Sequence, residues 1–158
     1  MEEEQASRRP PREEAKRVIL EAAKTLQLLA GRMDDSFDSA VGMIEGMPPG
    51  GRVVLTGVGK SGHVARKVAA SMSSTGTCAF FMHATEALHG DLGSVRQGDV
   101  CIAISYSGET PETLAALRGF KRLSAGSIAI TSDPESTLGR QSDVCLAMGS
   151  ITELDHNK

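Results

Sequence analysis

The sequence has few of the side chains with which proteins bind nucleic acids. It contains no tryptophan, one tyrosine and four phenylalanines in 158 residues, too few for platforms on which single-stranded bases stack. Its 17 lysines and arginines are outnumbered by 20 acidic residues, and the formal net charge is −3. A broad nucleic-acid-binding surface needs clustered basic residues instead. We therefore expect no nucleic-acid partner.

Long apolar segments and cysteine motifs are missing as well. No apolar run approaches the roughly 18 residues that span a bilayer, and the start, MEEEQASRRPPREE, lacks the apolar centre of a secretory signal. No two cysteines form a CxxC pair, and each cysteine lies in or beside an apolar run. We expect a cytoplasmic protein without membrane contact or a structural zinc cluster, with three reduced core cysteines, Cys78, Cys101 and Cys145.

The first 11 residues are charged and contain Pro10-Pro11, so we expect a disordered leader over residues 1–11 and a domain over residues 12–158. Apolar residues recur with helical spacing over residues 12–30 and again from about Asp34 to Met47. Five short apolar runs follow, none of which alternates with polar residues. Such runs are typical of strands covered on both faces.

These patterns predict an α/β fold, a three-layer αβα sandwich with a five-stranded parallel sheet of flavodoxin-like order and two N-terminal helices. The expected strands are residues 53–56, 78–82, 100–104, 127–131 and 144–148, and the expected later helices are residues 62–75, 111–122 and 135–142. Only ten residues follow the last strand, so we expect one face of that strand to lack a covering helix.

A first glycine loop, Gly57-Val58-Gly59-Lys60-Ser61-Gly62, follows the first strand and opens a helix, where backbone N–H groups can bind an anion. A Walker-type P-loop is excluded, because it needs a glycine where this chain has Val54. The loop satisfies G-x-G-x-x-G, so a dinucleotide site stays open. A dinucleotide site requires an acidic residue near the end of the second strand to bind the ribose hydroxyls, and the nearest acidic residue here is Glu86. A purely structural glycine turn is a third alternative.

A second loop, Ser105-Tyr106-Ser107-Gly108-Glu109-Thr110, ends the third strand and leads into a helix whose first residue is Pro111. Thr110 is expected as the N-cap of that helix. Three hydroxyls and exposed N–H groups suit a phosphate monoester. The alternative is that the hydroxyls only cap the helix. This alternative is weakened by the presence of two such loops at the carboxyl ends of neighbouring strands, because open α/β sheets bind ligands there.

A third stretch, from His83 to Gly93, contains His89 in a loop, where it could approach a polar ligand. Glu86 and Asp91 lie nearby in the sequence, but their spacing matches no familiar metal-ligand pattern.

Taken together, these residues resemble the sugar isomerase (SIS) domain family, whose phosphate signature is Ser-x-Ser-Gly-Glu-Thr. Three longer strings are similar to the arabinose-5-phosphate isomerases of that family, namely Thr56-Gly-Val-Gly-Lys-Ser-Gly-His63, Ser74-Thr-Gly-Thr77 and His89-Gly-Asp-Leu-Gly93. The resemblance covers roughly residues 12–153.

The resemblance implies interconversion of ribulose 5-phosphate and arabinose 5-phosphate through an enediol, with no cofactor, in a homodimer or homotetramer. It implies proton transfer and enediolate stabilisation by Lys60, Glu112 and Glu153, and an inhibitory zinc on His83. The sugar phosphate would be bound by Gly59, Ser61, Gly62, Gly76, Thr77, His89, Ser105, Tyr106, Ser107, Gly108 and Thr110.

The chain also departs from that pattern. Tyr106 stands where these isomerases often have asparagine, and the sequence from Glu153 to Lys158 replaces their Glu-Ala-Cys-Pro-Leu-Gly. Relatives continue into a further helix, a loop with another histidine and regulatory repeats, so we expect this chain to be truncated. A phosphosugar-sensing module without catalysis, or an isomerase of another sugar phosphate such as a hexulose phosphate, therefore remains an alternative.

Overall fold

A computed structural model of the chain describes residues 9–123 and 126–151. The contacts divide the chain into two units, of which residues 34–150 form one and residues 1–33 with 151–158 the other. The second unit contains helix α2 (Pro11–Ala30), which begins at a proline and has no buried residue. Of the predicted leader, residues 1–8 lie outside the described residues, and Pro11 already belongs to α2.

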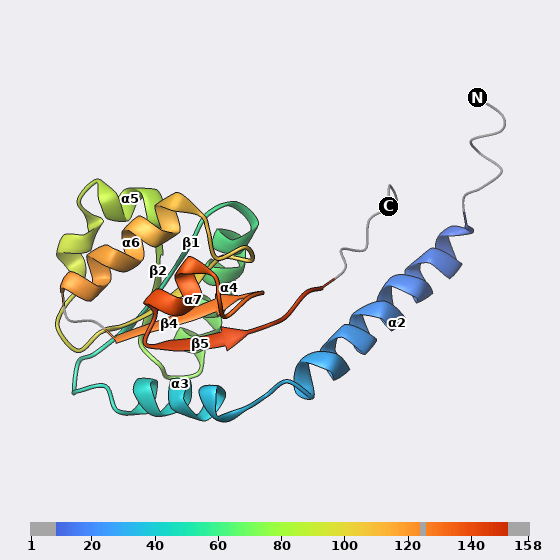
Figure 1. The fold of residues 1–158 in the computed structure, drawn as a ribbon, viewed down its shortest axis with the longest axis horizontal. Coiled ribbons are helices and arrows are strands. Elements are labelled where there is room, and N and C mark those ends of the chain that lie inside the picture. Colours follow the sequence, from blue (N-terminus) through green and yellow to red (C-terminus); the bar gives the residue numbers. More distant parts are fainter. Residues whose placement is uncertain (1–8, 124–125, 152–158) are drawn as a thin grey trace. The chain divides into compact units, whose positions relative to one another are not determined.

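Residues 34–150 form an α/β unit with the predicted architecture (Figure 1). Five parallel strands form one sheet in the order β2-β1-β3-β4-β5, which is the flavodoxin-like order. The elements are, in chain order, α3 (Asp35–Glu45), β1 (Val53–Gly57), α4 (Gly59–Ser74), β2 (Ala79–His83), α5 (Ala84–Leu88), the 3₁₀ helix η1 (Asp91–Ser94), β3 (Val100–Ile104), α6 (Pro111–Arg122), β4 (Gly126–Thr131), α7 (Thr137–Gln141) and β5 (Val144–Ala147).

The sheet separates two apolar clusters, because successive side chains of a strand point to opposite faces. On β1, Val54 packs with residues of α5, α6 and α7, whereas Val53 and Leu55 pack with residues of α3 and α4. Every residue of β1 and β3 is buried, as the apolar runs predicted. The three-layer arrangement is thereby confirmed. Among the described residues, no helix is long and apolar enough to cross a membrane.

The last strand is better covered than the sequence suggested. Val144 and Leu146 of β5 pack into the cluster that contains Ala40 of α3, and α7 lies near the same strand. All four residues of β5 are half-buried. The expectation of an uncovered face was wrong because it considered only the residues after β5, whereas α3 precedes the whole sheet in the chain.

Three local expectations also need correction. Helix α4 begins at Gly59, three residues before the predicted start, so the loop of the glycine motif is shorter than expected. Two short elements, α5 and η1, occupy the stretch that was expected to be a loop. Cys101 is buried and Cys145 half-buried, but Cys78 is exposed because it precedes β2 at the edge of the sheet.

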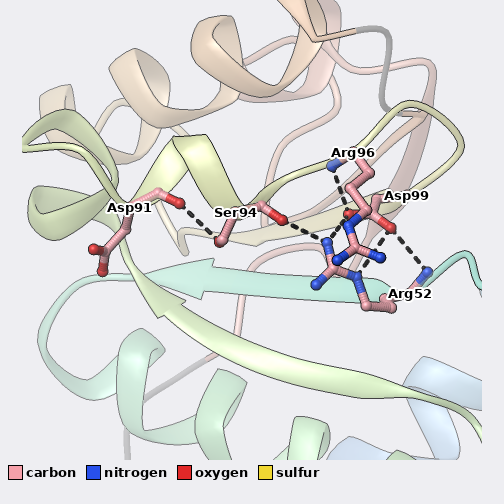
Figure 2. A network of polar contacts seen from close by, with 5 residues as sticks. All are labelled: Arg52, Asp91, Ser94, Arg96 and Asp99. Carbon is pink, nitrogen blue, oxygen red and sulfur yellow. Dashed lines mark hydrogen bonds and ion pairs between the residues drawn. The ribbon is translucent and has the colours of Figure 1, made fainter.

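A polar network joins β1 and β3 at the edge of the sheet where the strands begin (Figure 2). Asp99, which is 1% exposed, accepts hydrogen bonds from the backbone N–H groups of Arg52 (3.0 Å) and Arg96 (2.9 Å). Nη2 of Arg52 lies 2.6 Å from the second carboxylate oxygen of Asp99 and 2.6 Å from the carbonyl oxygen of Ser94. The guanidinium also lies over the ring of Phe80, 5.0 Å from its centre. The network therefore pins three chain segments at the edge opposite the glycine and serine loops.

Candidate functional site

The glycine loop and the serine loop meet at the carboxyl ends of β1 and β3, which are neighbours in the sheet. Helix α4 leaves β1 toward one face of the sheet and α6 leaves β3 toward the other, so the strand order switches here. A Cβ atom on Gly57 would lie 2.9 Å from the carbonyl oxygen of Ile104, and one on Gly62 would lie 2.9 Å from that of Gly57. Only glycine permits this close approach. The start of the glycine loop therefore packs closely on the end of β3, from which the serine loop begins, and open α/β sheets bind ligands at this edge.

Both helices at this edge begin without a side-chain cap from any described residue. The N-cap of α4 is Val58, and the N-cap of α6 is Thr110, whose side chain makes no capping bond. The other α-helices of the α/β unit are capped, α3 by Asp34, α5 by His83 and α7 by Ser136. An uncapped helix start offers N–H groups and a positive dipole end to an anion. The uncapped starts thus coincide with the edge to which the motifs point.

The hydroxyls of the serine loop bond within the loop. Oγ of Ser105 and Oγ1 of Thr110 lie 2.9 Å apart, which explains why Thr110 occupies the predicted N-cap position without capping α6. The N–H of Gly108 donates to the carbonyl oxygen of Ser105 (3.1 Å), and the N–H of Glu109 donates to Oγ of Ser107 (3.2 Å). These bonds fold the loop into a compact turn directly before the first turn of α6.

Residues from the end of β4 to the start of α7 support the serine loop on one side. The carbonyl oxygen of Tyr106 accepts from the N–H and the hydroxyl of Ser132 (2.9 and 2.7 Å) and from the hydroxyl of Thr131 (3.1 Å). The N–H of Leu138 donates to the carbonyl oxygen of Gly108 (3.0 Å). These supporting residues were not predicted from the sequence, because no motif links them to the loop.

The predicted catalytic residues Lys60 and Glu112 are exposed second residues of α4 and α6, respectively. They therefore belong to the two uncapped first turns. Glu153, the third predicted catalytic residue, lies outside the described residues.

The predicted binding residues fall into separate groups. Gly59, Ser61 and Gly62 belong to the start of α4, at the same sheet edge as the serine loop. Gly76 and Thr77 follow α4 and precede β2, so they lie at the edge where the strands begin, and within one chain they do not join that group. His89 is exposed and is the C-cap residue that follows α5.

His83, predicted to take zinc, caps α5 by accepting a hydrogen bond at Nδ1 from the N–H of Thr85 (3.2 Å). Zinc binding there would have to use Nε2. Searching the described part of the chain for three clustered histidine, cysteine or acidic side chains finds none. Zinc binding by His83 stays a prediction.

Comparison with models of protein families shows to which family the chain belongs. The model of the SIS domain matches residues 49–153, which include both loops and the whole sheet. The chain belongs to the SIS domain family.

Curated relatives of this SIS domain include arabinose 5-phosphate isomerases. That of Francisella tularensis is 47% identical over 124 residues, which are 78% of this chain and 38% of that protein. That of Escherichia coli K12 is 53% identical over 98 residues, which are 62% of this chain and 30% of that protein. The SIS domain thus spans less than half the length of these relatives.

Solved structures share the fold. The c3406 protein of Escherichia coli CFT073, in complex with arabinose 5-phosphate, matches with a TM-score of 0.80 and 36% identity over 94% of this chain and 80% of that chain. NanR of Vibrio vulnificus, complexed with ManNAc-6P, matches with a TM-score of 0.75 and 25% identity over 86% of this chain and 51% of that chain. Both structures hold a phosphorylated sugar.

Proposed function

We propose that this SIS domain binds a sugar phosphate at the β1–β3 edge. The observation that carries the proposal is the convergence of two uncapped helix starts, those of α4 and α6, at that edge. A phosphate dianion supplies the acceptors and negative charge that such helix starts lack. Ser61, Ser107 and Thr110 would add hydroxyl donors, as the resemblance implies. The complex of the c3406 protein with arabinose 5-phosphate supports the same ligand class.

The proposed reaction of the whole protein is the interconversion of ribulose 5-phosphate and arabinose 5-phosphate through an enediol. A general base removes the proton beside the carbonyl, and an acid moves protons between the two oxygens. Glu112 and Glu153 are proposed for proton transfer, and the ammonium of Lys60 for stabilising the enediolate. Lys60 and Glu112 begin helices on opposite faces of the sheet, so a sugar held at the edge between them can reach both.

Calorimetric titration of this chain with arabinose 5-phosphate tests the binding site. We expect binding of arabinose 5-phosphate and no binding of arabinose or NAD, because the site recognises a phosphate monoester, which arabinose lacks and which NAD, a pyrophosphate diester, does not carry. Ser107→Ala should weaken affinity roughly tenfold through the loss of one hydrogen bond to a charged group. Ser39→Ala, at an exposed position of α3, is the matched control and should leave the affinity unchanged. Binding of NAD would instead revive the dinucleotide interpretation.

A sensor without catalysis is the second candidate, since a bound phosphorylated sugar, as in the similar structure of NanR, indicates binding and not turnover. Turnover separates the two. If the protein is an isomerase, Lys60→Ala and Glu112→Gln should each reduce the rate about a hundredfold or more while affinity is retained. Binding without turnover, in this chain and in one extended at its C-terminus, would favour the sensor. Preference for a hexulose phosphate would change the substrate assigned here.

We also propose that the protein forms a homodimer or homotetramer. Support comes from α2, where Ile19, Leu20 and Leu26 are each about two-thirds exposed, at 67%, 68% and 66%. Exposed apolar side chains on one helix favour burial against a partner. Sedimentation velocity at micromolar concentration should show more than one chain per particle, and a monomer mass would contradict this.

A further inference from the structure

Glu109 lies inside the serine loop but directs its carboxylate out of it. Its Oε1 accepts a hydrogen bond of 2.7 Å from the backbone N–H of Thr137, the first residue of α7. Thr137 is 28 residues further along the chain. The bond therefore joins the loop after β3 to the helix after β4.

Because Glu109 carries a negative charge, the direction of its side chain affects the binding of an anion at the loop. The hydrogen bonds from Thr137, with a smaller contribution from the charge of Arg140, lower the pKa of Glu109 despite a small opposing effect of desolvation. The side chain is thus a carboxylate at neutral pH. A carboxylate turned toward the ligand would repel a phosphate. Bonding to Thr137 holds this charge on the α7 side of the loop.

The bond also completes the support of the loop. Tyr106 and Gly108 are each held by their carbonyl oxygens, to Ser132 and Leu138. Between Gly108 and the start of α6 the chain passes only through Glu109 and Thr110. The Glu109 carboxylate ties this second half of the loop to α7, in addition to the contact of Thr110 with Ser105 inside the loop.

We propose that Glu109 is a positioning residue for the phosphate. By bonding to α7 it fixes the loop so that Ser107, Thr110 and the first turn of α6 face one anion together, and it keeps its own charge away from that anion. The inference rests on the proposed function, since it concerns the same phosphate site.

Titration with inorganic phosphate and with arabinose 5-phosphate tests this role in the intact chain. Glu109→Ala should raise both dissociation constants by about tenfold, and Glu109→Gln, which keeps an acceptor, should recover most of the affinity. The matched control is Glu135→Ala, because Glu135 lies beside α7, its side chain is 80% exposed, and its carboxylate forms a long ion pair of 3.9 Å with Arg140. The hydrogen bonds of Glu135 to Asp133 and Arg140 use its backbone and remain in the variant. Glu135→Ala should leave both constants within about twofold of wild type.

A second variant deletes the same bond from the other side. Thr137 is the first residue of α7, where proline is well tolerated, and Ser136 before it is already extended (φ −60°, ψ 160°). Thr137→Pro removes the donor N–H and should weaken phosphate binding as much as Glu109→Ala, with no further loss in the double variant.

The outcomes distinguish this inference from the proposed function. If wild type binds and both Glu109→Ala and Thr137→Pro bind within twofold of it, Glu109 has no positioning role and the site stands. Failure of wild type to bind either ligand overturns both. If Glu109→Gln weakens phosphate binding as much as Glu109→Ala, the hydrogen bond to Thr137 does not determine the affinity, and the inference is wrong.

Discussion

Replacing Asp99 by alanine should lower the free energy of unfolding by about 3–5 kcal/mol, the usual cost of removing one partner of a buried ion pair. Asp99 is 1% exposed, and Arg52 retains 19% of its side-chain exposure. The change leaves the N–H groups of Arg52 and Arg96 without their acceptor and the guanidinium without its counter-charge. For a chain of this length the melting temperature should fall by roughly 10 °C, measured by calorimetry.

The pH dependence of stability should change in the same variant. Desolvation alone would raise the pKa of Asp99, but the bonds from Arg52 and from the N–H groups of Arg96 and Arg52 outweigh it and lower the pKa. The unfolded chain then binds more protons than the folded one just below the ordinary aspartate pKa of about 3.9. Stability from Asp99 is thus complete above that pH and is lost as the pH falls through the lower folded value. Asp99→Ala should lose less stability on acidification than wild type.

Asp91 provides the control for this prediction. Its carboxylate points away from the network, and only its carbonyl oxygen takes part, as acceptor from Ser94 (2.8 Å; Figure 2). Asp91→Ala should stay within about 0.5 kcal/mol of wild type, as surface substitutions usually do. Equal losses in Asp91→Ala and Asp99→Ala would show that the network does not carry the stability assigned to it.

Gly108→Ala should both destabilise the fold and abolish phosphate binding. Gly108 has φ +68°, and a Cβ atom there would overlap Oγ of Ser136 and lie 2.8 Å from Oγ1 of Thr131. The left-handed backbone costs about 1–2 kcal/mol for alanine, and the overlap about 1–3 kcal/mol more. Relief of the overlap requires the serine loop to move away from α7, which misplaces its N–H groups. Unfolding by denaturant and titration with arabinose 5-phosphate measure the two effects.

Gly50→Ala is the control that separates the two causes of destabilisation in Gly108→Ala, namely the strain of a left-handed backbone and the overlap of the new Cβ atom. Gly50 has φ +85°, but a Cβ atom there meets nothing within 4 Å, and it lies outside the candidate site. It should cost only about 1–2 kcal/mol and leave phosphate affinity unchanged. If Gly108→Ala still binds arabinose 5-phosphate as wild type does, the close packing of the loop on α7 is not needed for recognition.

Much of the fold could be predicted from the sequence because its strands are buried on both faces. Continuous apolar runs such as that of β3 specify parallel strands, and Pro111 marks the start of α6 at the right residue. The five-residue helix α5 was missed because it is too short to show a helical period, whereas α7, of the same length, was expected over residues 135–142. The packing of α3 near β5 was missed because it joins distant parts of the chain.

The site was partly predictable for a related reason. Motifs directly after β1 and β3 must meet if those strands are neighbours, and family resemblance pointed to the same loops. Gly76 and Thr77 were assigned to the pocket by motif alone, although α4, at 16 residues and about 1.5 Å per residue, returns the chain to the opposite edge. The bond between Glu109 and Thr137 carries no sequence signal, because any backbone N–H can donate it.

The most direct test of a phosphate site at the β1–β3 edge is an amide NMR titration of this chain with arabinose 5-phosphate. The N–H groups of Gly59–Gly62, Ser107–Thr110, Glu112 and Thr113 should shift together and saturate with one dissociation constant, while those of Arg52, Arg96 and Asp99 keep their positions in the spectrum. Shifts confined to other parts of the chain, or none at saturating ligand, would contradict the proposed site.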